Sequence, residues 1–233
     1  MTQALFRNDA YKKTCETKVT EVNDGGIVIE QTVFYPQGGG QPGDSGFLQL
    51  ANGETIRITD TRHGEGDKIL HMTEPDRPLP VPGDKVSVEL DWDRRYAHMR
   101  MHTCLHLLGA VLRYGVTGGA ITADKSRLDF DMQDTVDKEL VTQKVNALIK
   151  ADHPVETRWI TEDELDQQPE LIRTMAVKPP RGVARIRLLE IPGVDLQPCG
   201  GTHVARTGEI GPVRIKKVEK KGAHNRRVHI VFG

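Results

Sequence analysis

Two short motifs in this sequence can together supply four metal ligands: HTCLH at residues 102–106 and CGGTH at residues 199–203. Each motif places two histidine or cysteine side chains four residues apart. Imidazole and thiolate are the ligands that zinc prefers, and four of them complete a tetrahedral shell. Because the motifs lie about ninety residues apart in the chain, only a folded domain can bring them together.

The first motif lies in a predicted helix. Asp93 is expected to cap this helix and Gly115 to end it, because the apolar residues between them recur at helical spacing. On a helix, His102 and His106 lie on one face, one turn apart, and can bind one ion. His98 and His102 form a competing pair at the same spacing. We favour His102 and His106 because this pair lies deeper in the apolar part of the helix.

The second motif places Cys199 and His203 on either side of two glycines, which let the backbone turn tightly so that both ligands point inward. A metalloprotease of the HExxH type has a glutamate after its first histidine as general base, but Thr103 occupies that position here. A metalloprotease of that type is therefore disfavoured. Four protein ligands normally indicate a structural zinc, whereas a catalytic zinc keeps one position open. The sequence leaves open whether one ligand is weak, whether the shell expands, or whether the ion only positions the substrate.

The first ninety residues are predicted to form β structure. Alternating apolar runs surround the turns Asn23-Asp24-Gly25-Gly26 and Asn52-Gly53, and a third run follows Pro82-Gly83, which predicts a small barrel or sandwich. Helices are then expected over about 134–150 and from Thr161, where TEDE is a capping-box pattern. The segment 212–232 is expected to form two strands around a basic loop. We predict a boundary near residue 90, between a β domain and an α+β domain.

The composition is that of a globular protein, with 37% hydrophobic and 28% charged residues. The net charge is −1, so a nucleic-acid partner would need a local basic patch. Three cysteines argue against a disulfide framework and for a reducing compartment. The N-terminus is too polar for a signal peptide, and no apolar run is long enough to cross a membrane. We expect a cytoplasmic protein without membrane contact, and no protein partner is evident.

Four segments, in this order, resemble the editing domain of alanyl-tRNA synthetases and its free-standing relatives, the AlaX proteins. They are TVFYPQGGGQPGDSG (32–46), RRYAHMRMHTCLHLL (94–108), CGGTHVARTGEIG (199–211) and KGAHNRRV (221–228). The resemblance implies an α+β fold, with a glycine-rich-loop β-barrel domain at 1–90 and a zinc-binding editing domain at 91–233. The latter is of the threonyl/alanyl-tRNA synthetase second-additional-domain type.

The resemblance also implies an activity: a hydrolase that deacylates mischarged tRNA(Ala), chiefly seryl-tRNA(Ala) and sometimes glycyl-tRNA(Ala). It implies one Zn²⁺ per chain at His102, His106, Cys199 and His203, and its register supports His102 and His106 over His98. The motif departs from the family at Cys104, where relatives often carry a small residue. We interpret Cys104 as a core residue, with redox sensing or competition for metal as the alternatives.

Selectivity for serine over alanine requires a group that hydrogen-bonds the additional hydroxyl. Thr32 and Gln41 flank the glycine-rich loop and are the predicted groups; the resemblance places Thr32 in the pocket. Gly39 and Gly40 have no side chains, so their backbone N–H groups can approach a substrate closely. Together with Thr202, these residues form the predicted catalytic and substrate-binding set. The alternative is that the loop is only a tight turn of the barrel.

Binding of tRNA requires basic contacts to phosphates, which give salt-sensitive affinity. The predicted contacts are Arg94, Arg95, Arg100, Arg214, Lys217, Lys221, Arg226 and Arg227. A solvated charged face is the alternative for the basic run near the C-terminus. Two other functions remain open: a non-catalytic structural-zinc tRNA-binding module, and a general zinc hydrolase acting on small esters or amides.

Overall fold

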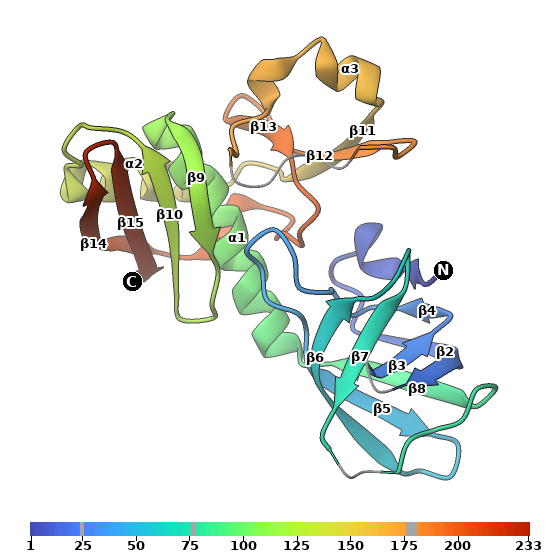
Figure 1. Cartoon of the computed structure of the whole chain (residues 1–233). Coiled ribbons are helices and arrows are strands. Elements are labelled where there is room, and N and C mark those ends of the chain that lie inside the picture. The colour runs from blue at the N-terminus through green and yellow to red at the C-terminus, as the bar shows by residue number, and fades with distance from the viewer. Residues whose placement is uncertain (24–25, 76–77, 176–180) are drawn as a thin grey trace. The chain divides into compact units, whose positions relative to one another are not determined.

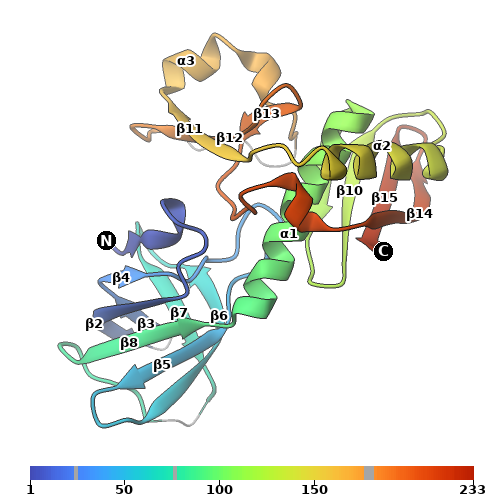
Figure 2. The same ribbon diagram turned by 180° about the vertical axis from the view of Figure 1, so that it is seen from behind.

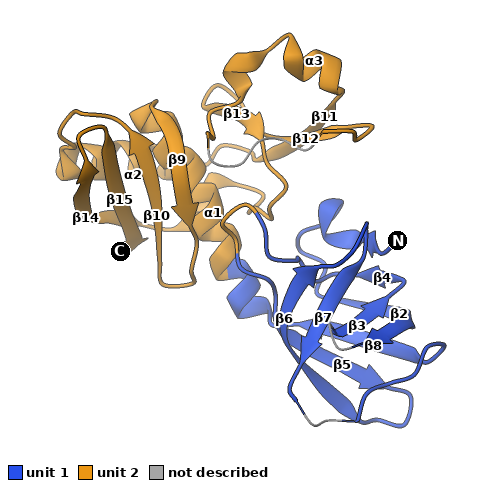
Figure 3. Cartoon of the chain, viewed as in Figure 1, with its two compact units in different colours: residues 1–38, 42–96 blue, residues 39–41, 97–233 orange. Residues whose placement is uncertain are grey.

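The protein is described by a computed structural model that covers residues 1–23, 26–75, 78–175 and 181–233. The chain forms two compact units, shown in blue and orange in Figure 3. Unit 1 comprises residues 1–38 and 42–96, and unit 2 comprises residues 39–41 and 97–233. Three residues of the glycine-rich loop therefore belong to unit 2. The assignment of domains to 1–90 and 91–233 stays a prediction.

Unit 1 is a closed barrel of six antiparallel strands in the order β2-β3-β7-β6-β5-β8, which confirms the predicted barrel (Figure 1). The strands are β2 (Thr14–Asn23), β3 (Gly26–Ile29), β5 (Gly46–Leu50), β6 (Thr55–His63), β7 (Ile69–Thr73) and β8 (Lys85–Leu90). A short parallel pair, β1 (Gln3–Ala4) and β4 (Gln31–Thr32), lies outside the barrel sheet, and a 3-10 helix, η1 (Leu5–Arg7), follows β1. Of the two predicted hairpin turns, Asn52-Gly53 joins β5 to β6, with Gly53 at φ +88°. Asp24 and Gly25 of the other turn lie outside the described residues.

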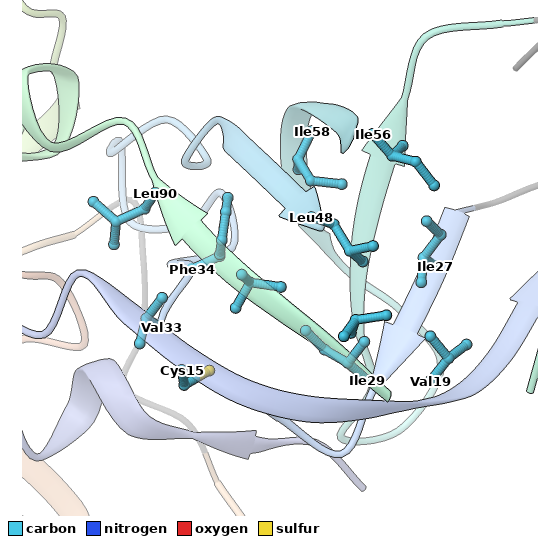
Figure 4. Close-up of a cluster of buried hydrophobic side chains, with 12 residues drawn as sticks. Cys15, Val19, Ile27, Ile29, Val33, Phe34, Leu48, Ile56, Ile58 and Leu90 are labelled. Atoms are coloured by element: carbon cyan, nitrogen blue, oxygen red, sulfur yellow. The ribbon is translucent and has the colours of Figure 1, made fainter. Parts of the chain in front are cut away.

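The barrel forms because its strands alternate apolar and polar residues, so that one face of each strand points inward. In β8, for example, Val86, Val88 and Leu90 are buried while Lys85 and Glu89 are exposed. Figure 4 shows how these inward side chains meet. The barrel core consists of Cys15, Val19, Ile27, Ile29, Val33, Phe34, Leu48, Ile56, Ile58, Val86, Val88 and Leu90.

Helix α1 (Trp92–Leu112) carries the first histidine motif, and both of its predicted ends need correction. Asp91, not Asp93, caps the helix, because its Oδ1 accepts the backbone N–H of Arg94 at 3.2 Å. At the other end, Arg113 adopts the left-handed conformation (φ 59°) that usually favours glycine. Gly115 is the first residue of the next strand.

Unit 2 contains a four-stranded sheet in the order β14-β15-β10-β9 (Figure 1). It also contains a three-stranded sheet in the order β11-β12-β13 (Figure 2). The first sheet consists of β9 (Gly115–Ala120), β10 (Lys125–Asp131), β14 (Val213–Gly222) and β15 (Asn225–Phe232). The second consists of β11 (Glu156–Ile160), β12 (Ile186–Ile191) and β13 (Asp195–Pro198). The predicted pair of C-terminal strands is thus confirmed.

Two further helices complete unit 2. Helix α2 (Lys138–Lys150) begins later than predicted, at the N-cap Asp137, and packs on β14, where Thr142 accepts the N–H of Ile215. Helix α3 (Glu162–Asp166) has the capping box predicted at Thr161, and the 3-10 helices η2 (Pro169–Leu171) and η3 (Thr207–Ile210) follow later in the chain. Among the described residues, no helix combines the length and apolar character needed to cross a membrane.

Candidate metal centre

The four predicted ligands form one cluster in unit 2, although they come from two distant segments. His102 and His106 lie on α1, and Cys199 and His203 lie in the loop after β13. One potential ligand atom from each residue lies within 4.8 Å of the others. Cys199 Sγ is 3.2 Å from His203 Nε2 and 3.6 Å from His102 Nε2. The cluster can therefore bind a metal ion.

The spacing and chemistry of the cluster fit zinc. Bonds of about 2.0–2.3 Å in a tetrahedral shell would separate the ligand atoms by roughly 3.3–3.8 Å, which is close to the sulfur–nitrogen distances found here. The three histidines are buried, whereas Cys199 is only half-buried.

Each histidine of the cluster is oriented by a different hydrogen-bond partner at Nδ1. Gln41 Oε1 lies 2.9 Å from Nδ1 of His102, and Asp195 Oδ2 lies 2.8 Å from Nδ1 of His106. Thr103 Oγ1 lies 3.2 Å from Nδ1 of His203. A proton on Nδ1 that is donated to such an oxygen leaves Nε2 as the ligand atom. All three rings are thus arranged to bind through Nε2.

Helix α1 explains the orientation of His203. The Thr103 hydroxyl donates to the Met99 carbonyl one turn earlier, at 2.9 Å, so its oxygen is left to accept from His203 Nδ1. Thr103 therefore supports a ligand from the position where an HExxH protease would carry its glutamate. The hydroxyl also accepts the backbone N–H of Val204 at 3.3 Å, which ties the second motif to the helix.

The two glycines of CGGTH have different roles. A Cβ atom on Gly201 would lie 2.2 Å from Cε1 of His102 and 2.9 Å from Oε1 of Gln41, so only glycine leaves room for the imidazole. A Cβ atom on Gly200 would meet nothing within 4 Å, and neither glycine has a positive φ. Space beside a ligand, rather than an unusual backbone conformation, is thus the reason for glycine at position 201.

The pKa shifts differ from one member of the cluster to the next. Burial raises the pKa of the Cys199 thiol, but the nearby His102 and His203 outweigh it and hold this pKa well below its usual 9.0, which favours the thiolate. Burial lowers the pKa of His106, but Asp195 and Cys199 raise it to about 10. The shift of His106 indicates that its surroundings stabilise a cation. Burial and the nearby His102 instead hold the pKa of His203 well below its usual 6.5, so His203 stays neutral.

His98 and Cys104 were the open questions of the first motif. His98 is buried on α1 and is not one of the four clustered residues, so the competing pair does not form this site. Cys104 is fully buried, and burial raises its pKa to about 12, so its thiol stays protonated. Cys104 is a core residue, in agreement with the interpretation from sequence.

The glycine-rich loop reaches the cluster through Gln41. Gly39 and Gly40 have φ of +56° and +83°, which favour glycine, and the Gly40 carbonyl accepts the N–H of Ile121 at 2.9 Å. The side chain of Gln41 is fully buried; its Nε2 donates to Thr202 Oγ1 at 2.8 Å, and its Oε1 accepts the Thr202 N–H at 3.2 Å. Gln41 therefore joins the loop to both ligand motifs.

Thr32 lies in unit 1, where its hydroxyl makes two hydrogen bonds. Because the neighbouring Ile27 carbonyl must accept from Nδ1 of His71, at 3.0 Å, the other ring nitrogen accepts the Thr32 hydroxyl proton, at 2.8 Å. The Thr32 oxygen in turn accepts the N–H of Phe34 at 3.1 Å. Only an acceptor role is left for a further partner, and substrate contact at Thr32 stays a prediction.

The predicted tRNA contacts divide by exposure. Two are corrected: Arg95 and Arg226 are buried, with guanidinium groups that donate to protein oxygens, so neither can bind a phosphate in this fold. Three are half-buried, with protein partners: Arg94 donates to the Gly43 carbonyl, Arg100 to the Ile210 carbonyl and Arg227 to Asp129. The exposed ones are Arg214, Lys217 and Lys221.

The three exposed basic side chains differ in whether an acidic side chain of the protein neutralises their positive charge. Lys217 and Lys221 both form ion pairs with Glu219, at 2.5 and 3.3 Å. Arg214 has no acidic partner within the described part of the chain. Arg214 is therefore the predicted contact most available to an external anion, and its role in tRNA binding stays a prediction.

Asp195, Gln197 and Arg173 were not predicted. Asp195 and Gln197 lie in β13, and Cys199 directly follows this strand. The three residues are spaced two apart, so their side chains are expected on one face of the strand. This alternation is the signal in the sequence that could have identified them. Arg173 forms an ion pair with Asp195 at 3.2 Å, and no local pattern predicts that contact.

Comparison with known proteins adds family evidence to this geometry. Residues 186–229 match the family described as threonyl and alanyl tRNA synthetase second additional domain, and residues 3–94 match class II (A) tRNA synthetases. An alanine–tRNA ligase of Pyrococcus abyssi is 35% identical over 94% of this chain but only 24% of the ligase. The chain thus corresponds to one part of that larger protein.

Similarity over the full length is found with free-standing proteins. The alanyl-tRNA editing protein AlaX-M of Saccharolobus solfataricus is 35% identical over 98% of both chains. The protein of the same name from Methanosarcina barkeri is 37% identical over 100% of this chain and 99% of its own. The chain belongs to the AlaX-M family of alanyl-tRNA editing proteins.

Proposed function

We propose that this chain is a trans-editing hydrolase that cleaves the aminoacyl ester of mischarged tRNA(Ala), with one zinc ion at the His102–His106–Cys199–His203 cluster. The substrate is chiefly seryl-tRNA(Ala), with glycyl-tRNA(Ala) as a second one. The observation that carries the proposal is the convergence of these four donors in a member of the AlaX-M family. The cytoplasm, where charged tRNA is found, is the proposed site of action.

Zinc is proposed because three imidazoles and one thiolate are the donor set it prefers. A zinc ion held there supplies a positive charge that can polarise the ester carbonyl or orient the substrate. The protein's own part is to hold the donors, through Gln41, Thr103 and Asp195, and to keep the thiol of Cys199 ionised.

The glycine-rich loop is proposed to bind the aminoacyl group. Gly39 and Gly40 leave their backbone N–H groups open to close approach, and Gln41 holds Thr202 beside the cluster. Serine is recognised in this proposal by hydrogen bonds to its hydroxyl, with Thr32 as an acceptor and Gln41 through its amide. Because the Thr32 hydroxyl proton is already donated to His71, a serine hydroxyl would have to donate to Thr32.

The tRNA backbone is proposed to contact the exposed basic side chains of β14. Arg214, Lys217 and Lys221 remain the contacts of this proposal, and they would give salt-sensitive affinity that does not depend on sequence. Ion pairing with Glu219 reduces the charge that the two lysines offer, so Arg214 is expected to contribute most.

A structural-zinc module that binds tRNA without chemistry is the alternative. It is favoured by the complete set of four protein donors, since closed shells are typical of structural zinc. This alternative predicts that seryl-tRNA(Ala) binds without releasing serine, and that zinc removal lowers the melting temperature.

A deacylation panel tests the proposal. The purified protein is mixed with seryl-, glycyl- and alanyl-tRNA(Ala), and release of each amino acid is followed. We expect rapid serine release, slower glycine release and little alanine release. Cys199→Ala should abolish release, whereas Cys15→Ala, in the barrel core, should not.

Two results would contradict parts of the proposal. Unchanged serine release by a verifiably metal-free protein would exclude the role of zinc. Binding of seryl-tRNA(Ala) without release, in protein loaded with one zinc ion, would establish the structural module instead.

A further inference from the structure

The three histidine ligands differ in the charge of the groups that orient them. His102 is held by the amide of Gln41 and His203 by the hydroxyl of Thr103, both neutral. His106 alone is held by a carboxylate, that of Asp195, at 2.8 Å. A carboxylate that accepts from Nδ1 makes an imidazole a better electron donor at Nε2 and fixes the direction of its lone pair. His106 is therefore the ligand with the strongest support.

The Asp195 carboxylate is hydrogen-bonded through Oδ2 and forms an ion pair through Oδ1. Its side chain is fully buried, and a buried carboxylate is costly unless charged or hydrogen-bonding partners surround it. Gln197 Nε2 donates to Oδ2 at 2.7 Å, and Arg173 Nη1 lies 3.2 Å from Oδ1 in an ion pair that lacks hydrogen-bond geometry. The fold thus offsets the cost of placing a negative charge directly behind one ligand.

The hydrogen atoms in this group can be assigned from its contacts. Gln197 Nε2 lies 3.0 Å from His106 Nδ1 and 2.7 Å from Asp195 Oδ2. Turning the amide over would place its oxygen against the carboxylate oxygen, so the nitrogen must face Asp195. Because an NH₂ group has no lone pair to accept with, the proton on His106 Nδ1 is directed to Asp195. Asp195 Oδ2 accepts from both neighbours, and Nε2 of His106 faces the other ligands.

We propose that Asp195 is a positioning residue for the metal ion: it orients His106 and sets the affinity of the cluster, with Gln197 and Arg173 holding it in place. The inference rests on the metal site of the proposed function. It assigns unequal roles to the three histidines, with His106 as the anchor. Arg173, which is one-third exposed, supports the carboxylate from the surface side.

Zinc affinity of the purified full-length protein tests the inference without any tRNA. Competition with a chromophoric chelator at constant pH gives the dissociation constant. Asp195→Asn should weaken zinc binding by about 10–100-fold, the range typical of such outer partners. Arg173→Ala should weaken it less, because the carboxylate and its bond to His106 remain. Glu190→Gln is the matched control: it removes another carboxylate of the same sheet, one that pairs with Arg158, and should leave zinc affinity unchanged.

A second measurement separates positioning from folding. In the zinc-loaded protein, nitrogen-15 NMR of the histidines should show His106 bearing its proton on Nδ1, with a strongly downfield proton signal. Asp195→Asn should shift or remove that signal while the circular dichroism spectrum stays native. Zinc affinity of Asp195→Asn within about twofold of wild type, or an unchanged His106 signal, would overturn the inference. Deacylation by the wild-type protein is scored separately, so failure of the proposed activity is distinguishable from failure at Asp195.

Discussion

Each unit of the molecule contains a buried polar cluster, and the two clusters differ in what they leave unsatisfied. In unit 1, Arg95 forms an ion pair with Asp44 and also donates to the carbonyls of Ala10 and Val33. Asp44 additionally accepts the N–H of Tyr35 at 2.6 Å. Both side chains of the pair are fully buried. Every charged group in this cluster has a protein partner, so the cluster needs no ligand.

The cluster of unit 2 is satisfied only on one side. Each imidazole has a partner for Nδ1, but the three Nε2 atoms and the Cys199 thiol converge on each other, without intervening donors. A cation held between these four atoms would be a partner for all of them at once. Burial of polar residues therefore does not by itself identify a binding site. A binding site is indicated where polar atoms without any other protein partner point toward one another, as the three Nε2 atoms and the Cys199 sulfur do.

The largest effect is expected from breaking the satisfied cluster. Asp44→Ala would leave the Arg95 guanidinium buried without its counter-charge, which should lower the free energy of unfolding by about 3–5 kcal/mol. Urea unfolding followed by circular dichroism measures this. The double substitution Asp44→Leu and Arg95→Met should recover most of the loss, because it removes both charges. A loss below about 1 kcal/mol in Asp44→Ala would show that this cluster is not structural.

The unsatisfied cluster should respond in function more than in stability. Gly201→Ala would drive a methyl group into the ring of His102, and we expect zinc affinity and serine release to fall on the order of 100-fold. Gly200→Ala is the neighbouring control, because its Cβ meets no atom within 4 Å. Equal effects of the two substitutions on zinc affinity would contradict the role of space beside His102.

Both ring nitrogens of His71 have protein partners, and we expect His71 to make the stability of the protein depend on pH. Burial lowers its pKa from 6.5 to about 4. Between these values the unfolded chain binds a proton that the folded chain does not, so stability falls as the pH falls. At pH 5 the loss is about 2 kcal/mol relative to pH 7. Urea unfolding of wild type and His71→Gln at both pH values isolates this contribution, and an identical pH dependence in both proteins would refute it.

The smallest effect is expected for tRNA binding by surface arginines. Arg214 is exposed, whereas Arg226 is buried, with a guanidinium that is hydrogen-bonded to protein carbonyls. Arg214→Gln removes an exposed cation and should reduce the salt dependence of tRNA binding by about one unit of slope. Arg226→Gln removes a guanidinium that donates to the carbonyls of Gly222 and Gln133, so it should change stability and leave the salt slope unchanged. Filter binding across a salt series distinguishes them, and a reduced slope in Arg226→Gln alone would reverse the assignment.

The sequence predicts those features that depend on local spacing. The spacing of His102 and His106, one helical turn apart, predicts that they lie on one face of a helix. The alternation of apolar and polar residues in the first ninety residues predicts the barrel. Strand β9 was missed because Gly118 and Gly119 interrupt its alternation. Burial of Arg95 could not be foreseen, since its partner Asp44 lies 51 residues away and only the folded barrel brings them together. The contact of Asp195 with His106, 89 residues away, could not be foreseen either, although the alternation of Asp195 with Cys199 marked it as a candidate.

Residues 39–41 belong to unit 2, and this limits how the chain can be cut into functional fragments. A gene fragment that begins at residue 91 would encode every metal ligand, yet it would lack Gln41, the group that orients His102. The histidine–cysteine segment is therefore not a self-contained module that recombination could move intact. Any fragment that is to keep the complete environment of His102 must therefore include the glycine-rich loop.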